Sequence, residues 1–440
     1  MKYYSTNGKA PIADLHKAVV KGLAEDRGLY MPEKINKLPK EFFDNIEKMS
    51  FQEIAYTVAS AFFGEDVDPD ALHDIVYDTL QFDCPVVNVK DNIYTLELFH
   101  GPTLAFKDVG ARFMARLLQY FIKQENNHKE VNVLVATSGD TGSAVANGFL
   151  GVDGIHVYVL YPKGKVSPIQ ECQFTTLGKN ITAIEVDGVF DDCQALVKNA
   201  FMDAELNEHM KLTSANSINV ARFLPQAFYY FNAYARIKEI ANTQHLSPNT
   251  QLVMCVPSGN FGNICAALFG HEMGLPIKRF IAANNANDIF YNYLQTGKYE
   301  PKPSKQTLAN AMDVGDPSNF ARIYDLYGKS HAKITSLISG ATYSDEQIKA
   351  TMRECYKDSG YILDPHGACG YQALKDGLQA GEVGVFCETA HPAKFKDKVD
   401  DILGIDVEIP ERLAAFMRGQ KQSVPMSKDF ADFKDYLMRQ

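Results

Sequence analysis

The stretch VNVLVATSGDTGSAVANGFL, residues 131–150, joins a short β-branched run to a glycine-rich turn and then to a segment of small residues. The β-branched run predicts a buried strand, and the small residues after the turn favour a helix. The segment QLVMCVPSGNFGNICAALFGHEMG, residues 251–274, repeats this order in the second half of the chain. Strands that alternate with helices predict an α/β protein, with parallel sheets flanked by helices on both faces.

Further segments extend this pattern on either side. Strands are predicted at HVYVLYP (156–162), ITAIEV (181–186), KRFIAAN (278–284) and EVGVFCE (382–388). One long helix is predicted over 190–209. Another follows Ser344, which forms a capping-box pattern with Gln347, and ends near Gly360. We therefore expect two α/β lobes, at 95–235 and 236–440, preceded by a mixed, largely helical extension at 1–94.

The overall composition excludes several classes of protein. The chain has 440 residues, of which 46% are hydrophobic and 22% charged, and its formal net charge is -10. An acidic balance argues against nucleic-acid binding, which relies on basic patches. The apolar runs are too short to cross a bilayer, and the N-terminal residues do not resemble a secretory signal. Eight cysteines without a CxxC pair predict neither a disulfide framework nor a zinc site, so no metal is expected and a cytoplasmic location is favoured.

The glycine-rich turns TSGDTG (137–142) and PSGNFGN (257–263) each follow a strand and open a helix. Glycine allows a sharp turn and a close approach of the backbone to a ligand, and the helix N-terminus offers N–H groups to an anion. One such turn is often needed for packing alone, but two with polar side chains favour anion binding. The dinucleotide, P-loop, metalloprotease and nucleophile-elbow motifs do not occur. A third turn, CETAHPAKF (387–395), is typical of a helix start, with Thr389 near the N-cap and Pro392 in the first turn.

Lys107 stands in FHGPTLAFKDVGARFMARL, residues 99–117, between an apolar loop and a predicted helix. A lysine at such a position is most often a surface residue whose stem packs on apolar neighbours. Here, however, the apolar loop and the positive end of the helix dipole both disfavour an ammonium and lower the expected pKa of the amine. A nucleophilic lysine together with a glycine-rich anion site is what a pyridoxal phosphate site requires.

The motifs together resemble the threonine synthase family, whose members are pyridoxal-phosphate enzymes of the fold group of the tryptophan synthase β chain. The resemblance runs nearly end to end, through LFHGPTLAFKDVGARFMARLL, ATSGDTGSAVANGF, YPKGKVSPIQE, SANSINVARFLPQ, VPSGNFGN, AMDVGDPSNF and TAHPAKF. It is strongest to the branch found in fungi and many bacteria. It implies the two-lobed fold type II of pyridoxal-phosphate enzymes.

The resemblance also implies roles for individual residues. Lys107 would be the catalytic lysine that forms the Schiff base with the cofactor, and Thr389 would face its pyridine nitrogen. Asp140 would flank the cofactor, although many relatives in the fold group have Asn there, which leaves its role open. The phosphate loop would consist of Ser258, Gly259, Asn260, Phe261, Gly262 and Asn263. The substrate would be bound by Thr137, Ser138, Asp140 and Thr141 at its carboxylate and by Asn216, Ser217, Arg222 and, more weakly, Lys163 at its phosphate.

The implied reaction converts O-phospho-L-homoserine and water to L-threonine and phosphate, by γ-elimination and β-hydration. Two alternatives stay open: a threonine or serine dehydratase-type lyase with the same cofactor, and a catalytically inactive homologue. The expected partner is this small-molecule substrate, with neither nucleic acid nor membrane. The oligomeric state stays open, with a monomer among the options.

Overall fold

The computed structural model describes residues 1–244, 247 and 249–440. The chain forms two compact units, and each is made of segments that are distant in the sequence. Unit 1 comprises Met1, Met31–Gly101 and Phe223–Glu408, and unit 2 comprises Lys2–Tyr30, Pro102–Arg222 and Ile409–Gln440. This grouping differs from the division at 1–94, 95–235 and 236–440, because the first hundred residues are shared between the units and the last segment rejoins unit 2.

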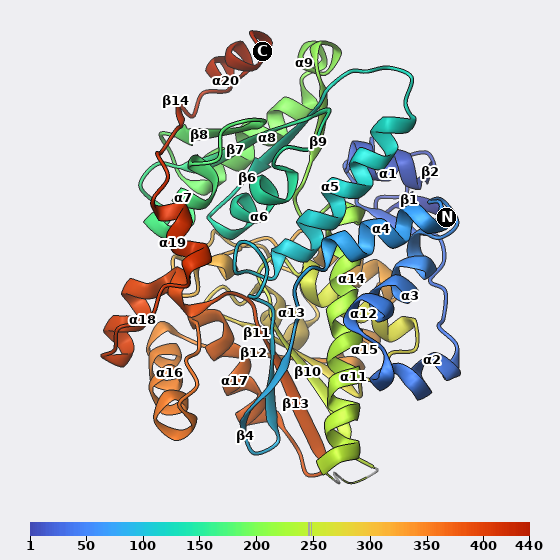
Figure 1. Ribbon diagram of the computed structural model, residues 1–440, viewed down its shortest axis with the longest axis vertical. Coiled ribbons are helices and arrows are strands. Elements are labelled where there is room, and N and C mark those ends of the chain that lie inside the picture. The colour runs from blue at the N-terminus through green and yellow to red at the C-terminus, as the bar shows by residue number, and fades with distance from the viewer. Residues whose placement is uncertain (245–246, 248) are drawn as a thin grey trace. The chain divides into compact units, whose positions relative to one another are not determined.

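Unit 2 is built on a five-stranded parallel sheet with the order β14-β8-β7-β6-β9. Alternate residues of its strands face opposite sides, as the two-residue period of a strand requires. One side packs on α8 (Phe190–Met202) and α20 (Phe430–Met438) around Leu134, Leu160 and Leu196, and α6 (Asp140–Phe149) covers β6 and β7 on the other side (Figure 1). The strands are β6 (Val131–Ala136), β7 (Ile155–Pro162), β8 (Ile181–Val186), β9 (Lys211–Ser214) and β14 (Val424–Met426).

Unit 1 is built on a six-stranded sheet with the order β12-β11-β10-β13-β5-β4, parallel except for the β4–β5 edge pair. Helix α17 (Pro365–Gly377) packs along its central strands, and α16 (Asp345–Ser359) packs on α17 (Figure 1). The strands are β4 (Val86–Lys90), β5 (Ile93–Glu97), β10 (Gln251–Pro257), β11 (Arg279–Asn284), β12 (Ile338–Thr342) and β13 (Glu382–Glu388).

The strands predicted from the sequence are confirmed as β6, β7, β8, β10, β11 and β13, and the alternation predicted the parallel sheets correctly. The capping box of Ser344 with Gln347 is present, and α16 ends at Gly360 with a φ of 73°. The single helix predicted over 190–209 is wrong. The chain breaks at Asp203, whose carboxylate accepts a hydrogen bond from the Leu206 N–H at 2.9 Å and thereby starts a second helix, α9 (Ala204–His209).

The residues before β4 divide between the two units. In unit 2, β1 (Lys2–Ser5) pairs antiparallel with β2 (Ala13–Asp14), and α1 (Leu15–Lys21) follows. In unit 1, α3 (Phe51–Phe63) packs on α4 (Pro69–Thr79) and on α11 (Ala227–Gln244). The aromatic run of α11 is buried, at Phe228, Tyr229, Tyr230 and Phe231, so its role is core packing, as the helical spacing predicted.

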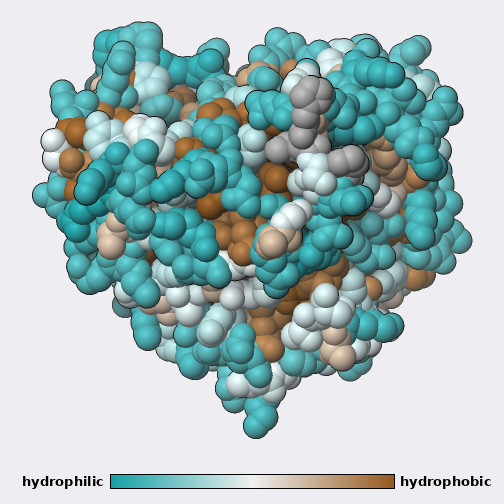
Figure 2. All heavy atoms as spheres, turned by 90° about the horizontal axis from the view of Figure 1, so that it is seen from below, coloured by the Kyte–Doolittle hydropathy of each residue, from teal (hydrophilic) through white to brown (hydrophobic). Residues whose placement is uncertain are grey.

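Exposed hydrophobic side chains are few in the described part of the chain. The large ones are Ile12, Val189, Met202 and Met417, and they are distant from one another in the sequence. On the face drawn in Figure 2 most of the surface is hydrophilic, and hydrophobic residues show mainly in recesses between polar side chains. No helix among the described residues is long and apolar enough to cross a membrane.

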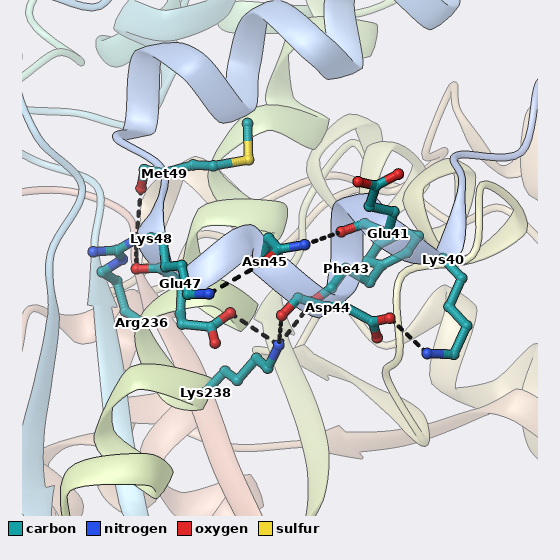
Figure 3. A network of polar contacts seen from close by, with 10 residues as sticks. All are labelled: Lys40, Glu41, Phe43, Asp44, Asn45, Glu47, Lys48, Met49, Arg236 and Lys238. Carbon is teal, nitrogen blue, oxygen red and sulfur yellow. Dashed lines mark hydrogen bonds and ion pairs between the residues drawn. The ribbon is translucent and has the colours of Figure 1, made fainter.

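Two cations of α11 fasten the helical layer of unit 1 (Figure 3). The ammonium of Lys238 donates to the carbonyl oxygens of Phe43 at 2.9 Å and Asp44 at 2.7 Å, and it pairs with the Glu47 carboxylate at 2.9 Å. Arg236 donates to the carbonyl oxygen of Met49 at 2.9 Å. The carbonyls at the end of α2 (Lys40–Asn45) lack partners within that helix, so Lys238 acts as its C-terminal cap.

We expect Lys238→Met to lower the free energy of unfolding by about 1–2 kcal/mol, because it removes a charged donor and leaves the half-buried Glu47 carboxylate without its cation. Chemical denaturation measures the change. Lys40→Met is the matched control, since the Lys40 side chain is 86% exposed and its pair with Asp44 contributes little. Equal effects of the two substitutions would contradict a capping role for Lys238.

Candidate functional site

Lys107 is the first residue of α5 (Lys107–Gln124), in unit 2, and its side chain is half-buried. The apolar stripe predicted for this helix is confirmed by the burial of Val109, Phe113 and Leu117. The loop before the helix contains Leu104, which has a φ of 61° although it is not glycine and is nearly fully buried. A left-handed conformation at a bulky residue is costly and persists only where the surroundings enforce it.

The loop before Lys107 is held by Asp108, which is 1% exposed. Its carboxylate accepts hydrogen bonds from the Thr103 hydroxyl at 2.6 Å and from the Thr103 N–H at 2.9 Å. The side-chain amide of Gln173, on α7 (Pro168–Thr175), donates to the Thr103 carbonyl oxygen at 3.1 Å. These bonds fix the backbone on one side of Lys107, so the start of its side chain is held in place without using the amine.

The amine of Lys107 lies 2.7 Å from the Thr141 hydroxyl oxygen, to which it donates. Thr141 is in the first turn of α6, so the structure brings together two residues that the sequence placed in separate motifs. The amine also lies 5.6 Å from the centre of the Phe106 ring. The predicted lowering of the Lys107 pKa stays a prediction.

The TSGDTG turn between β6 and α6 contains Gly139, whose φ is 146°. The hydroxyl oxygen of Thr137 accepts hydrogen bonds from the N–H groups of Gly139 at 2.9 Å and Gly142 at 2.8 Å, which sets the shape of the turn. Asp140 is 6% exposed and accepts a hydrogen bond from the Gln170 side-chain amide at 3.0 Å. Thr137 and Asp140 therefore have structural partners within unit 2, and Ser138 is half-buried beside them.

The residues expected to bind a substrate phosphate follow two strands of the same sheet. Lys163 is exposed directly after β7, and Asn216 and Ser217 are half-buried after β9. The Asn216 side-chain amide reaches the Ala136 carbonyl oxygen at the end of β6, at 3.5 Å. Arg222 is only 2% exposed, and its guanidinium donates to the Ala215 carbonyl oxygen. It is thus a buried cation that holds the segment carrying Asn216.

In unit 1 the PSGNFGN segment joins β10 to α12 (Gly262–Glu272), as predicted. Phe261 has a φ of 65°, and its ring packs against Phe290 with 4.6 Å between the centroids. The left-handed backbone turns the chain sharply into the helix. Among the first N–H groups of α12, that of Ile264 donates to the Asn263 side-chain oxygen at 2.8 Å. Those of Gly262 and Asn263 have no acceptor within the helix, as at any helix N-terminus.

The polar side chains of this loop form hydrogen bonds that hold it in shape. Ser258 and Asn263 are buried, and the Ser258 hydroxyl donates to the Asn263 side-chain oxygen at 3.2 Å. The Asn263 side-chain amide donates to the Pro257 carbonyl oxygen at 2.9 Å. Asn260 accepts a hydrogen bond from the Ser318 N–H at 2.7 Å. The side chains thus hold the shape of the loop through bonds within unit 1.

Gly259 is the residue at which this loop packs against the backbone of a neighbouring segment. A Cβ atom built on it would lie 2.7 Å from the Ala311 carbonyl oxygen and 2.9 Å from the Met312 Cα. Both atoms belong to backbone, which cannot move aside as a side-chain tip would. The glycine is therefore required by packing between the loop and the 3-10 helix η3 (Asn310–Met312).

Thr389 follows the last residue of β13 and is 6% exposed. The helix start predicted for this turn is confirmed, with Pro392 in its first turn, but the cap lies two residues after Thr389. The N-cap is His391, whose Nδ1 accepts a hydrogen bond from the Ala393 N–H at 3.0 Å, and Pro392 takes the first helical position. Because Thr389 is not used as a cap, its hydroxyl is not committed to the helix that follows.

Several residues that shape these segments were not identified from the sequence. Gln170, Gln173 and the brace formed by Asp108 and Thr103 lie outside the glycine-rich turns. Their only signal is a polar residue at a position that helical spacing would bury. Among the described residues no group of His, Cys, Asp and Glu is arranged to hold a metal ion.

Three sequence families match the chain. The family described as "Pyridoxal-phosphate dependent enzyme" matches residues 82–387, "Threonine synthase N terminus" matches 2–80, and "Threonine synthase, C-terminal" matches 367–437.

Individual proteins match over the whole chain. The threonine synthases of Serratia marcescens and Escherichia coli are 43% and 42% identical to it, with 100% of this chain and 99% of each relative covered. The crystal structure of threonine synthase from Escherichia coli superposes with a TM-score of 0.92 at 43% identity, with 100% of both chains covered. The structure of PLP-bound threonine synthase from Brucella melitensis gives a TM-score of 0.91 at 34% identity, covering 100% of this chain and 99% of that one. A maize serine racemase, 16% identical, covers 76% of this chain and 92% of its own with a TM-score of 0.52, and so shares the fold.

Asp108→Asn should lower the free energy of unfolding by about 2 kcal/mol, because an amide cannot accept both hydrogen bonds from Thr103 in a buried place. Chemical denaturation of the unliganded protein measures this. Asp70→Asn is the matched control, since Asp70 also lies in the first turn of a helix but is exposed. An unchanged stability in Asp108→Asn would show that the loop before Lys107 is held by other contacts.

Proposed function

The chain belongs to the threonine synthase family of pyridoxal-phosphate-dependent enzymes, and we propose that it converts O-phospho-L-homoserine and water to L-threonine and phosphate with Lys107 as its catalytic lysine. The observation that carries this proposal is the half-buried Lys107 amine, held 2.7 Å from the Thr141 hydroxyl at the start of α5. A hydroxyl carries no charge, so it orients the amine without stabilising the ammonium form as a carboxylate would. This contact therefore leaves the amine able to react with an aldehyde.

The residues present fit pyridoxal phosphate. The loop from Ser258 to Asn263 is fixed by the packing of Gly259 against η3, and it leads into the start of α12, where the N–H groups of Gly262 and Asn263 have no acceptor within the helix. We assign the cofactor's phosphate to the backbone of this loop, which comprises Ser258, Gly259, Asn260, Phe261, Gly262 and Asn263. We assign its ring nitrogen to the Thr389 hydroxyl, and Asp140 to the set of residues beside the cofactor.

When bound, pyridoxal phosphate supplies an electron sink that stabilises negative charge at the substrate's Cα. Lys107 then accepts the proton from Cα and later returns it, which places its amine in the role of general base and general acid. Thr141, which accepts a hydrogen bond from that amine, orients it for both steps. Thr389 carries no charge, so it does not attract a proton to the ring nitrogen. We expect this to favour elimination over transamination.

The substrate would be held at its two anionic ends. We assign its carboxylate to the turn of Thr137, Ser138, Asp140 and Thr141, where Gly139 lets the backbone approach. The phosphate goes to Asn216 and Ser217, with Lys163 as an exposed cation nearby in the sheet. We assign Arg222 to the phosphate as well, since its buried guanidinium, which donates to the Ala215 carbonyl oxygen, places a positive charge in the segment that carries Asn216.

A threonine or serine dehydratase-type lyase is the second candidate, since it would use the same lysine and phosphate loop. The basic residues Arg222 and Lys163 favour a phosphorylated substrate instead. We also propose a cytoplasmic location and the small-molecule substrate as the partner, without nucleic acid.

Lys107→Ala should abolish the cofactor's visible absorption band and lower phosphate release from O-phospho-L-homoserine by about 10²–10⁴-fold or more, because the general base is lost. Lys123→Ala, at the exposed end of the same helix, is the control and should keep both the absorption band and the rate of phosphate release. Release of a ketoacid from threonine, without phosphate release from phosphohomoserine, would favour the dehydratase. A band in the parent protein without any turnover would favour an inactive homologue.

Gly259→Ala should weaken pyridoxal phosphate binding at least about tenfold, because the added methyl group meets the Ala311 carbonyl and displaces the loop by an overpacking of about 1–3 kcal/mol. Equilibrium dialysis measures the dissociation constant. Gly377→Ala is the control, since its Cβ would meet only the tip of Ile281 at 3.3 Å. Unchanged binding in Gly259→Ala would exclude this loop as the phosphate site.

A further inference from the structure

Glu388, the last residue of β13, carries a buried carboxyl group directly before Thr389. Its exposed fraction is 0%, and within the described part of the chain neither carboxyl oxygen has a conventional donor. A Cβ built on Gly367 would lie 2.3 Å from one of these oxygens, so the carboxyl group fills the space over the first turn of α17. An ionised carboxylate without donors in such a place is very costly.

The partner of Glu388 is a second buried carboxyl group, that of Asp364. Both carboxyl groups lie at Gly367: its N–H donates to Asp364 at 2.7 Å, and a Cβ built on it would lie 2.3 Å from a Glu388 oxygen. Each carboxyl group also shifts the pKa of the other. Two ionised carboxylates are both acceptors only, so this proximity requires one proton between them. Asp364 already accepts a hydrogen bond from the Gly367 N–H at 2.7 Å, as the N-cap of α17, and another from His366 Nδ1.

The state of His366 follows from its other ring nitrogen. The Ala311 N–H donates to His366 Nε2 at 3.1 Å, so that nitrogen carries no proton. The ring is therefore neutral, and its proton is on Nδ1, which donates to Asp364. With two donors and a helix N-terminus beside it, Asp364 is the ionised member of the carboxyl pair. The proton between the two acids then belongs to Glu388.

The surroundings support this assignment. Burial and the charge of Asp364 raise the pKa of Glu388 well above its usual range. Burial disfavours the charge of Asp364 as well, but the hydrogen bonds that its carboxylate accepts from His366 Nδ1 and the Gly367 N–H stabilise it. Among the described residues, the other titratable groups that interact with this pair are Glu97 on β5, Tyr361 before α17, Cys369 on α17 and His391 after β13. Glu97 accepts a hydrogen bond from the Tyr361 hydroxyl at 2.6 Å and contacts His100 at 3.0 Å, so both of its carboxyl oxygens have other partners.

We propose that Glu388 is an uncharged acid that donates its proton to Asp364, and that the chain Ala311–His366–Asp364–Glu388 is a positioning network for Thr389 and for the loop at Gly259. One end of the network is the residue next to Thr389. The other end is Ala311, against whose carbonyl Gly259 packs. The role toward the cofactor rests on the function proposed above, whereas the proton arrangement does not.

The network has a chemical consequence for the proposed site. A negative charge one residue from Thr389 would attract a proton to a ring nitrogen held by that hydroxyl. An uncharged Glu388 exerts no such attraction, and Asp364 directs its charge toward His366, Gly367 and Glu388. Neither Thr389 nor Glu388, the residue before it in β13, then carries a charge.

The first test compares Glu388→Gln with Glu382→Gln in the protein without added cofactor. Both acids are buried and lie at opposite ends of β13, but Glu382 pairs with Lys278 at 2.9 Å and Arg279 at 2.7 Å, which lower its pKa to about 2. Glutamine at 388 keeps the donation to Asp364, so Glu388→Gln should be as stable as the parent, or more stable, at pH 7. Glu382→Gln should be less stable.

The pH dependence has a definite sign. A group whose folded pKa is raised stabilises the protein fully below its unfolded pKa, about 4.5, and that stability is lost as the pH rises toward the folded value. The folding equilibrium constant of the parent should therefore fall about tenfold per pH unit relative to Glu388→Gln above pH 5. The assignment would be overturned if the difference in stability between the parent and Glu388→Gln did not change with pH. It would also be overturned if Glu388→Gln lost as much stability at pH 7 as Glu382→Gln.

Infrared spectroscopy of the parent covers the case in which Glu388→Gln fails to fold. At pH 8 the exposed acids are ionised, and so is Asp313, whose pKa burial raises to about 6. A C=O band of a protonated carboxylic acid at this pH would support the proposal, and its absence would overturn it.

The second test addresses the cofactor. Glu388→Gln should bind pyridoxal phosphate with the parent's dissociation constant, whereas Asp364→Ala should bind it at least tenfold more weakly, although neither residue is assigned a contact with it. His366→Gln replaces Asp364→Ala if the latter does not fold. Equal binding by all folded variants would overturn the positioning role. If the parent itself binds no pyridoxal phosphate, the proposed function fails while the stability results still decide the proton arrangement.

Discussion

The parallel pairing of the strands is the constraint on which the other features depend. Parallel strands end at the same edge of a sheet, so the residues that directly follow them lie close together at that edge. In unit 2 this edge receives the turn after β6, Lys163 after β7 and Asn216 after β9. In unit 1 it receives the loop after β10 and Thr389 after β13, which are neighbouring strands. Within each unit, the proposed site residues that follow the strands are thus brought together by the register of one sheet, and their loops need only be shaped locally.

Local shape was the part that the sequence predicted well. Glycine-rich turns, a capping box and β-branched runs each act within a few residues, so the strands, the turns and the start of α5 were found where they were expected. The site residues near Thr137, Ser258 and Thr389 follow predicted strands, as does Lys163. Asn216 and Ser217 follow β9, which was not predicted. Lys107 and Thr141, from different motifs, proved to be in direct contact.

The remaining features depend on contacts between distant residues, which leave no local pattern. The helix over 190–209 was broken by Asp203, because an aspartate favours a new N-cap over a helix interior. Glu388 belongs to no motif of its own, and its partner Asp364 comes from another element. The grouping of the chain into units could not be predicted, since it depends on which segments pack together after long intervals of sequence.

Strand β13 shows two solutions to the burial of an acid. At its start Glu382 keeps its charge because two cations meet it, and at its end Glu388 has no cation and packs against another carboxyl group. The first solution adds electrostatic attraction, and the second avoids placing a further charge beside Thr389. One strand therefore combines a strongly charged end, which serves the fold, with an end whose lack of charge suits the chemistry proposed there.

The pairing of β14 with β8 has a consequence for synthesis of the protein on the ribosome. Strand β8 emerges early, but β14 is made only after the whole of the second long segment of unit 1. Until then β8 is an open sheet edge that offers unpaired N–H and C=O groups to any neighbouring chain. The nascent polypeptide thus has to protect this edge for most of its translation, which makes the late-arriving tail a safeguard against aggregation as well as part of the fold.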